Sequence, residues 1–288
     1  MNALEIRGLS KVYRGKRGKK VEALTNLDLD ISAGEVFGFL GPNGAGKSTT
    51  IKTVMGQIIP SSGNVKIFGV PVGDTSSRLK LGYLPENPAF YDFMTAREYL
   101  RFVGTVFGMD ITAVEKNSER VLGLLDLSES ADRSIRGYSK GMVQRLGLAQ
   151  ALVHDPDLYI LDEPMSGLDP IGRALVKEII KELKSRGKTV FFSTHITADV
   201  EAVCDRVGVI SRGVLEAVDS VDSILDKGIE GYVIRFCRAD LLDEEKHVTR
   251  EELDTVMKQM LEGHAVIKSV EPKRKNMESF FLSVVSKS

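Results

Sequence analysis

A short glycine-rich segment constrains this chain more than any other feature. Residues 41 to 49 match the pattern G-x-x-x-x-G-K-[ST]. They follow the apolar stretch Val36 to Leu40, which predicts a buried strand, and they precede Ile51, Val54 and Met55, whose spacing suits a helix. A phosphate-binding loop requires this context of strand, glycine-rich loop and helix, so a chance glycine-rich turn is a poor explanation.

The composition of the loop follows from the chemistry of phosphate binding. Glycines let successive backbone N–H groups turn inward around phosphate oxygens, and the N-terminus of the next helix adds partial positive charge. We predict that Lys47 reaches the terminal phosphates and that the Ser48 hydroxyl is a ligand of Mg²⁺. A dinucleotide fold is disfavoured, because the G-x-G-x-x-G spacing is absent and Lys47 would have no role. The predicted phosphate-binding residues are Gly41, Pro42, Asn43, Gly44, Ala45, Gly46, Lys47, Ser48 and Thr49.

A second motif supplies the acidic groups that such a site needs. Leu158 to Leu161 predicts another buried strand, and Asp162 and Glu163 follow it directly. We expect Asp162 to hold the metal ion and Glu163 to orient or deprotonate an attacking water. Two carboxylates could merely end a strand, but the phosphate-binding loop elsewhere in the chain makes that explanation weak.

Composition narrows the class of protein. The chain has 288 residues and a formal net charge of -1, which excludes a pervasive nucleic-acid footprint. No stretch approaches the roughly 18 uninterrupted apolar residues that a membrane-spanning helix needs, and the N-terminus shows no secretion signal. Cys204 and Cys237 are most simply free thiols in a reducing cytosol. We expect a cytosolic protein that something else anchors if it works at a membrane.

The order of predicted elements indicates an α/β fold. Short apolar strands alternate with helices up to about residue 218, which argues for a mostly parallel sheet covered on both faces. Two Ser/Thr-x-x-Glu patterns predict capping boxes in a helical block, Thr95 with Glu98 and Thr112 with Glu115. From residue 219 the pattern predicts a small α+β unit of two strands and two amphipathic helices.

These residues together resemble the ATP-binding subunit of an ABC transporter over roughly residues 1 to 218. In that family an aromatic residue stacks on adenine, and Tyr13 stands at its place, although it could equally be a strand-edge tyrosine. The segment Tyr138 to Arg145 resembles the signature motif that opens a helix. The resemblance implies that Ser139 and Gly141 contact the γ-phosphate bound by a partner subunit, so that two ATP molecules lie between two facing subunits. Compared with the common family form, Tyr138, Lys140 and Met142 replace Leu, Gly and Gln.

Three further positions take their roles from the resemblance. Asp169 matches the loop that communicates between the two sites, and it is also a predicted helix cap before Pro170. His195 matches the switch histidine that contacts the γ-phosphate. Glu86 stands where the family normally has glutamine and would offer an oxygen to Mg²⁺ or water. Apolar residues at 90, 91, 93 and 94 lie where the family docks a membrane subunit, although core packing explains most of them.

The expectation is therefore a P-loop NTPase with an ABC-type cassette at residues 1–218. It would contain an antiparallel β subdomain, a mostly parallel core sheet and a helical subdomain at about 88–155, followed by an accessory domain at 219–288. The implied function is Mg-ATP hydrolysis by a homodimer or heterodimer of ATPase subunits. That dimer would lie at the cytoplasmic face of the cell membrane and drive transport, with export expected, through integral membrane subunits. The alternatives are a soluble ABC-type ATPase of DNA repair or translation, and a regulatory nucleotide-binding module, which the intact Asp162–Glu163 pair disfavours.

Overall fold

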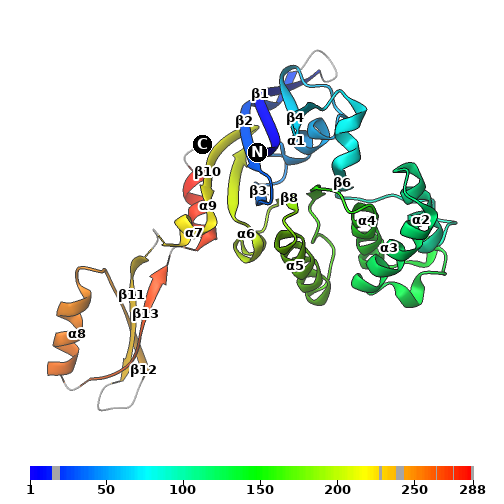
Figure 1. Ribbon diagram of the computed structural model, residues 1–288. Helices are drawn as coiled ribbons and strands as arrows, with labels where there is room; N and C mark the ends of the chain where they lie inside the picture. Colours follow the sequence, from blue (N-terminus) through cyan, green and yellow to red (C-terminus); the bar gives the residue numbers. More distant parts are fainter. Residues whose placement is uncertain (15–19, 227–228, 238–242, 264, 275, 287–288) are drawn as a thin grey trace. The chain divides into compact units, whose positions relative to one another are not determined.

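The computed structural model divides the chain into two compact units, Met1–Val218 and Asp219–Lys287 (Figure 1). It describes all residues except 15–19, 227–228, 238–242, 264, 275 and 287–288. Within the described residues, no helix has the length and apolar character needed to cross a membrane. Cys204 and Cys237 are both free thiols.

A six-stranded sheet forms the centre of the first unit. Its strands lie in the order β10-β9-β3-β8-β7-β6. The pairs β9–β3, β3–β8, β8–β7 and β7–β6 are parallel. The strands are β3 (Val36–Leu40), β6 (Leu81–Leu84), β7 (Leu158–Asp162), β8 (Thr189–Thr194), β9 (Arg206–Ser211) and β10 (Val214–Ser220). The mostly parallel sheet predicted from strand and helix alternation is confirmed.

Alternate residues of the central strands enter two different cores. Leu158 and Ile160 of β7 pack with the N-terminal strands and the helix after the glycine-rich loop, whereas Tyr159 and Leu161 pack with the helices on the other face. Since successive side chains of a strand point to opposite faces, both faces of the sheet are covered. The sheet is thus a rigid support for the loops at its strand ends.

An antiparallel sheet covers one of these faces. Its order is β2-β1-β4-β5, with β1 at Asn2–Arg14, β2 at Lys20–Ser32, β4 at Ser62–Ile67 and β5 at Val70–Pro71. Helix α1 (Lys47–Val54) contacts β2, β4 and β7. The helix that carries Lys47 and Ser48 is therefore buried between two sheets.

Helices α5 and α6 pack against the other face. Helix α5 (Pro170–Ser185) contacts β8, and α6 (Thr197–Val203) contacts β3, β8 and α5. Asp169 caps α5 by accepting a hydrogen bond from the Gly172 N–H at 2.7 Å, with Pro170 in the first turn as predicted.

Residues 88–155 contain helices and no extended strand. They are α2 (Ala96–Val106), α3 (Ile111–Leu124), α4 (Lys140–Leu152) and the short 3-10 helices η3 (Ser128–Ser130) and η4 (Ile135–Gly137). The capping box of Thr95 and Glu98 is confirmed. The second predicted box is wrong, because Asp110, two residues before Thr112, caps α3 and accepts from the Thr112 N–H. Glu115 is instead paired with Arg101 of α2.

The confirmed cap at Thr95 and the residue Thr112, which was wrongly predicted to be a cap, provide a matched stability test. We expect Thr95→Ala to lower the free energy of unfolding by about 1 kcal/mol, because it removes the acceptor of the Glu98 N–H. Thr112→Ala should cost clearly less, since the Asp110 carboxylate still accepts the N–H of residue 112. Urea denaturation of both variants measures the difference, and equal losses would contradict the assignment of the caps.

The second unit holds a three-stranded sheet of order β12-β11-β13, with β11 at Ile229–Cys237, β12 at Asp243–Val248 and β13 at Val266–Arg274. Helix α8 (Leu253–Glu262) covers one face of this sheet, and α7 (Val221–Asp226) contacts α9 (Met277–Val285) (Figure 1). The prediction of two strands and two helices therefore omitted strand β12 and helix α7. Strand β12 was not predicted because its charged sequence lacks an alternation of apolar and polar residues.

Candidate active site

The glycine-rich loop connects β3 to α1, as predicted. Gly44 and Gly46 have φ angles of 80° and 111°, which lie in the left-handed region that favours glycine. A Cβ on Gly41 would lie 2.5 Å from the Ile210 carbonyl oxygen, so no side chain fits there. These glycines allow the backbone to fold back over the N-terminus of α1, where backbone N–H groups can receive an anion.

A cavity of about 320 Å³ opens at this loop. Glu86, from the segment after β6, and Glu163, from the end of β7, face it together with the loop. The cavity is lined by Ala23, Asn43, Gly44, Gly46, Lys47, Ser48, Thr49, Glu86 and Glu163. The structure thus brings together most of the predicted phosphate-binding residues and two of the predicted carboxylates.

Lys47 is nearly buried, and its ammonium is satisfied within the loop. Nζ donates to the carbonyl oxygens of Gly41 at 2.7 Å and Pro42 at 3.2 Å. It also lies 3.4 Å from Glu163 Oε1, with both side chains at most 10% exposed. The cation and the carboxylate therefore form an ion pair on the wall of the cavity that would hold a phosphate.

Asp162 is held by hydroxyl groups on two sides. Ser193 Oγ of β8 donates to Asp162 Oδ1 at 2.6 Å, and the Ser48 hydroxyl is also hydrogen-bonded to this carboxylate. Burial raises the pKa of Asp162 above its ordinary value, although the two hydroxyls and Lys47 oppose the shift. Folding therefore places this carboxyl where its charged form is disfavoured.

This pKa shift predicts a stabilising substitution. Because the pKa of Asp162 is raised by folding, its carboxyl ionises at a lower pH in the unfolded chain than in the folded protein. Above the ordinary carboxyl pKa, this difference lowers the free energy of unfolding. We expect Asp162→Asn to raise Tm at neutral pH, because the neutral amide can still accept from Ser193. Asp169→Asn is the control, because asparagine caps a helix as well as aspartate does. Thermal unfolding without nucleotide or divalent ions measures both, and a lower Tm for Asp162→Asn would refute this account.

Glu163 is fixed by its backbone and by His195. Its φ of 49° is uncommon for a residue with a side chain. The conformation is supported by Ser193 Oγ, which accepts from the Glu163 N–H at 2.9 Å, and by Gln144 Nε2, which donates to the Glu163 carbonyl at 3.4 Å. His195 Nδ1 lies 3.0 Å from the carboxylate. Glu163 is therefore aimed at the cavity by contacts from β8 and α4.

Sequence reasoning missed Ser193 and Gln144. Ser193 opens the run Ser193-Thr194-His195, and its place beside Asp162 depends on the parallel register that pairs these two residues. The sequence does show that Ser193 and Asp162 both lie at the carboxyl ends of buried strands. It does not show which strands are neighbours in the sheet. Gln144 reaches the site from α4, and its contact depends on tertiary packing alone.

Tyr13 lies apart from the residues that line the cavity. It is near the end of β1, with 38% of its surface exposed, and Lys11 Nζ lies 5.1 Å from its ring centroid. The stacking of Tyr13 on adenine remains a prediction.

Ser139, Gly141 and Asp169 are not among the residues that line the cavity. Ser139 caps α4 by accepting from the Met142 N–H. A Cβ on Gly141 would meet Leu168 Cδ2 at 3.7 Å and Ser139 Oγ at 4.0 Å, which are ordinary contacts. The start of α4 therefore lies near Leu168, the residue before Asp169, and neither segment lines the cavity at the glycine-rich loop.

The donor set suits a hard divalent cation. Asp162 and Ser48 offer adjacent oxygens, and Glu86 adds a carboxylate on the cavity wall. Mg²⁺ prefers such ligands and usually takes its remaining ones from water and phosphate. Among the described residues no cluster of three or more His, Cys, Asp or Glu side chains could hold a metal ion without such help.

The large apolar and aromatic residues at positions 90, 91, 93 and 94 divide into two groups. Phe90 and Met94 pack against the core of the helical region, as the core-packing alternative predicted. Tyr91 and Phe93 are 57% and 73% exposed, and their ring centroids are 5.9 Å apart. The second pair therefore offers the larger exposed apolar surface to a partner.

Comparison with known proteins identifies the family of this chain. The family described as ABC transporter matches residues 24–166. An uncharacterised ABC transporter ATP-binding protein of Synechocystis is 45% identical over 81% of this chain and 67% of its own length. The linearmycin resistance ATP-binding protein of Bacillus subtilis is 37% identical over 75% and 68%. The Nod factor export ATP-binding protein I of Rhizobium meliloti is 36% identical over 83% and 70%.

A solved structure of the ATP-binding subunit of an ABC transporter gives the same result. It superposes with a TM-score of 0.71 at 32% identity and covers 77% of this chain and 91% of its own. The predicted fold class is confirmed by this agreement. With a phosphate-binding loop, a buried carboxylate pair and these relatives, the chain belongs to the ABC transporter ATP-binding proteins, which bind and hydrolyse ATP.

Proposed function

We propose that two copies of this subunit, or this subunit and a relative, enclose two Mg-ATP between them and drive export through separate membrane subunits at the cytoplasmic face. Lys47 and the loop N–H groups would bind the phosphates, and Ser48 and Asp162 would hold Mg²⁺, which would neutralise phosphate charge. Glu163 would orient or deprotonate the attacking water, with His195 and Glu86 beside it. Ser139, Gly141 and Asp169 would act on the partner's nucleotide.

Gly141 is the observation that carries the dimeric part of the proposal. Its backbone has space for a side chain within this chain, so folding alone does not require glycine. A glycine at an exposed helix start is explained if another molecule approaches the backbone closely. A phosphate held by the facing subunit is such a group. The absence of Ser139, Gly141 and Asp169 from the lining of the Lys47 cavity supports the same arrangement.

The test is nucleotide-dependent dimerisation. With Mg²⁺ and a non-hydrolysable ATP analogue, the wild-type mass measured by light scattering should double. Gly141→Asp should bind nucleotide equally well yet stay monomeric, because its carboxylate would repel the partner's phosphate. Gly123→Ala is the control, since it also fills open space beside a helical glycine. Loss of nucleotide binding in the Gly141→Asp monomer, or its normal dimerisation, would overturn the trans assignment.

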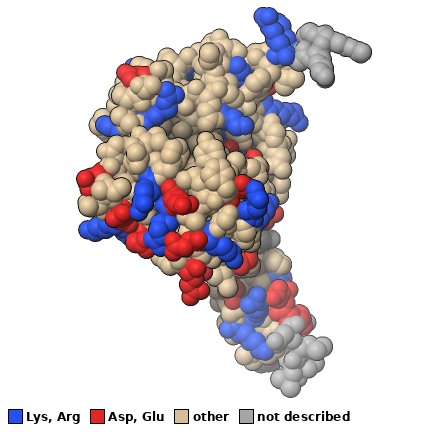
Figure 2. Space-filling model, turned by 90° about the vertical axis from the view of Figure 1, so that its right-hand side faces the viewer, with Lys and Arg blue, Asp and Glu red and all other residues tan. Residues whose placement is uncertain are grey.

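The membrane partner rests on different observations. Tyr91 and Phe93 expose apolar rings beside α2. The face in Figure 2 intermixes Lys and Arg with Asp and Glu, unlike the single-sign stripe of a nucleic-acid site. The export direction is supported by the relatives named for Nod factor export and linearmycin resistance.

Affinity purification from detergent-solubilised membranes tests the partner. The chain should retain a protein with several membrane-spanning segments, and Phe93→Glu should reduce this capture without changing the ATPase rate of the isolated chain. Leu261→Glu, at an exposed apolar position in the second unit, is the control. Retention of ribosomes or DNA instead would favour the translation or repair alternative.

A further inference from the structure

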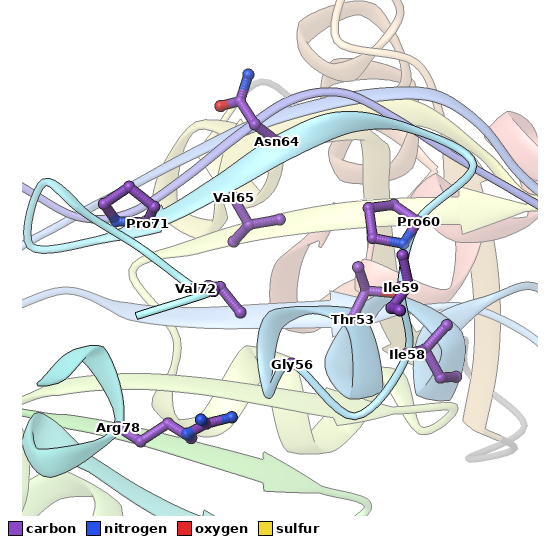
Figure 3. Close-up of a pocket in the computed structure, with 11 residues that line it drawn as sticks. Thr53, Gly56, Ile58, Ile59, Pro60, Asn64, Val65, Pro71, Val72 and Arg78 are labelled. Atoms are coloured by element: carbon purple, nitrogen blue, oxygen red, sulfur yellow. The ribbon is translucent and has the colours of Figure 1, made fainter. Parts of the chain in front are cut away.

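A second cavity lies at the opposite end of the phosphate-loop helix. Its volume is about 490 Å³, within the range of small-molecule sites. Figure 3 shows it between the C-terminal end of α1, strands β4 and β5, and the 3-10 helix η2 (Thr75–Lys80). This cavity shares no lining residue with the cavity at the glycine-rich loop.

The walls of this cavity are largely aliphatic. Val65 and Val72 are nearly buried within them, and Ile58 and Pro60 are half-buried at one side (Figure 3). The hydroxyl of Thr53 is already engaged, since it donates to the Thr49 carbonyl at 2.8 Å. This region therefore offers a bound molecule mainly apolar contact.

A single cation stands at one end of the cavity. In Figure 3 the side chain of Arg78 extends from η2 toward Gly56, and a Cβ on Gly56 would lie 3.2 Å from its guanidinium. Asp74 caps η2 through the Ser76 N–H at 2.9 Å, which fixes the element that carries Arg78. Among the described residues no carboxylate lies within ion-pair distance of Arg78. The guanidinium is thus available for an anion.

We propose that this cavity binds a small amphipathic anion, with its aliphatic body against Val65, Val72 and Ile58 and its carboxylate or phosphate on Arg78. Guanidinium groups recognise both headgroups through paired N–H donors. A Cβ on Gly56 would lie 3.2 Å from both Arg78 Nη1 and Val72 Cγ1, so one ligand can contact the charge and the apolar wall together. A free fatty acid and a lipid headgroup share this chemistry.

Sodium octanoate is a suitable probe for the full-length chain. Isothermal titration should show one saturable site, and Arg78→Gln should weaken binding by roughly tenfold or more. Ile58→Glu should weaken it as well, because its carboxylate would enter the apolar wall. Lys52→Gln, which removes an exposed cation on α1 outside the cavity, should bind octanoate as the wild type does.

Competition separates the sources of the ligand. Displacement of octanoate by dispersed short-chain phosphatidic acid would assign the site to a lipid headgroup, and its failure would assign it to free carboxylates. Equal binding of the uncharged analogue 1-octanol, unchanged affinity in Arg78→Gln, or absence of saturable binding would each overturn the proposal. So would site-specific crosslinking from residue 58 to a membrane subunit that blocks octanoate binding, because the occupant would then be protein. Since none of these readouts uses ATP, their failure leaves the proposed function intact.

Discussion

Glu163→Gln is expected to lower ATP turnover by at least ~100-fold while leaving ATP binding intact. The carboxylate lies 3.4 Å from Lys47 Nζ and 3.0 Å from His195 Nδ1. Glutamine keeps the shape of the side chain but cannot take a proton from water. ATP should therefore bind and hold the two subunits together without being hydrolysed. Steady-state hydrolysis, equilibrium nucleotide binding and light scattering measure the three effects.

Glu86→Gln is the matched control for this variant. It makes the same chemical change on the wall of the same cavity. We expect its turnover to stay within about tenfold of the wild type, because the group that would accept the proton from water remains. Turnover near the wild-type rate in Glu163→Gln would disprove the role assigned to Glu163.

Ser193→Ala is expected to have the second largest effect, a fall in kcat of roughly 10- to 100-fold. Its hydroxyl joins the two acidic residues, because it donates to Asp162 Oδ1 and accepts from the Glu163 N–H. Alanine leaves that buried N–H without a partner and releases the Glu163 backbone from its left-handed conformation. Misplacement of Glu163 should reduce kcat more than it changes nucleotide affinity, which steady-state and binding measurements separate.

Ser118→Ala tests whether this effect is specific to the site. Ser118 Oγ on α3 is also a buried hydroxyl, but it has no hydrogen-bond partner. Its removal should leave kcat unchanged and cost little stability. Equal kcat losses in the two variants would indicate that Ser193 supports the fold rather than the position of Glu163.

Local signals made much of the first unit predictable. The strand from Val36 to Leu40, the loop and the start of α1 follow from apolar runs and glycines that act within a few residues. The cap at Thr95 is of the same kind, because both partners of its hydrogen bonds lie within one turn. Residue spacing is sufficient wherever the interacting groups are sequence neighbours.

The remaining features depend on distant partners or on competition between equal local signals. Asp110 and Thr112 both suit a helix cap, and only the path of the chain after α2 decides between them. Strand β12 gains its structure from pairing with β11, not from its own sequence pattern. Arg78 has no recognisable motif, and its significance depends on a cavity whose walls come from four separate segments.

The contacts of Lys47 also bear on how tightly the subunit can hold its nucleotide. Its ammonium already donates to two carbonyls and faces a carboxylate. An incoming phosphate must replace these contacts, so loading is an exchange between partners of similar strength and its net free energy is modest. The same exchange in reverse returns Lys47 to the loop when the products leave. A lysine whose ammonium has partners both with and without nucleotide thus favours repeated binding and release of nucleotide over tight retention.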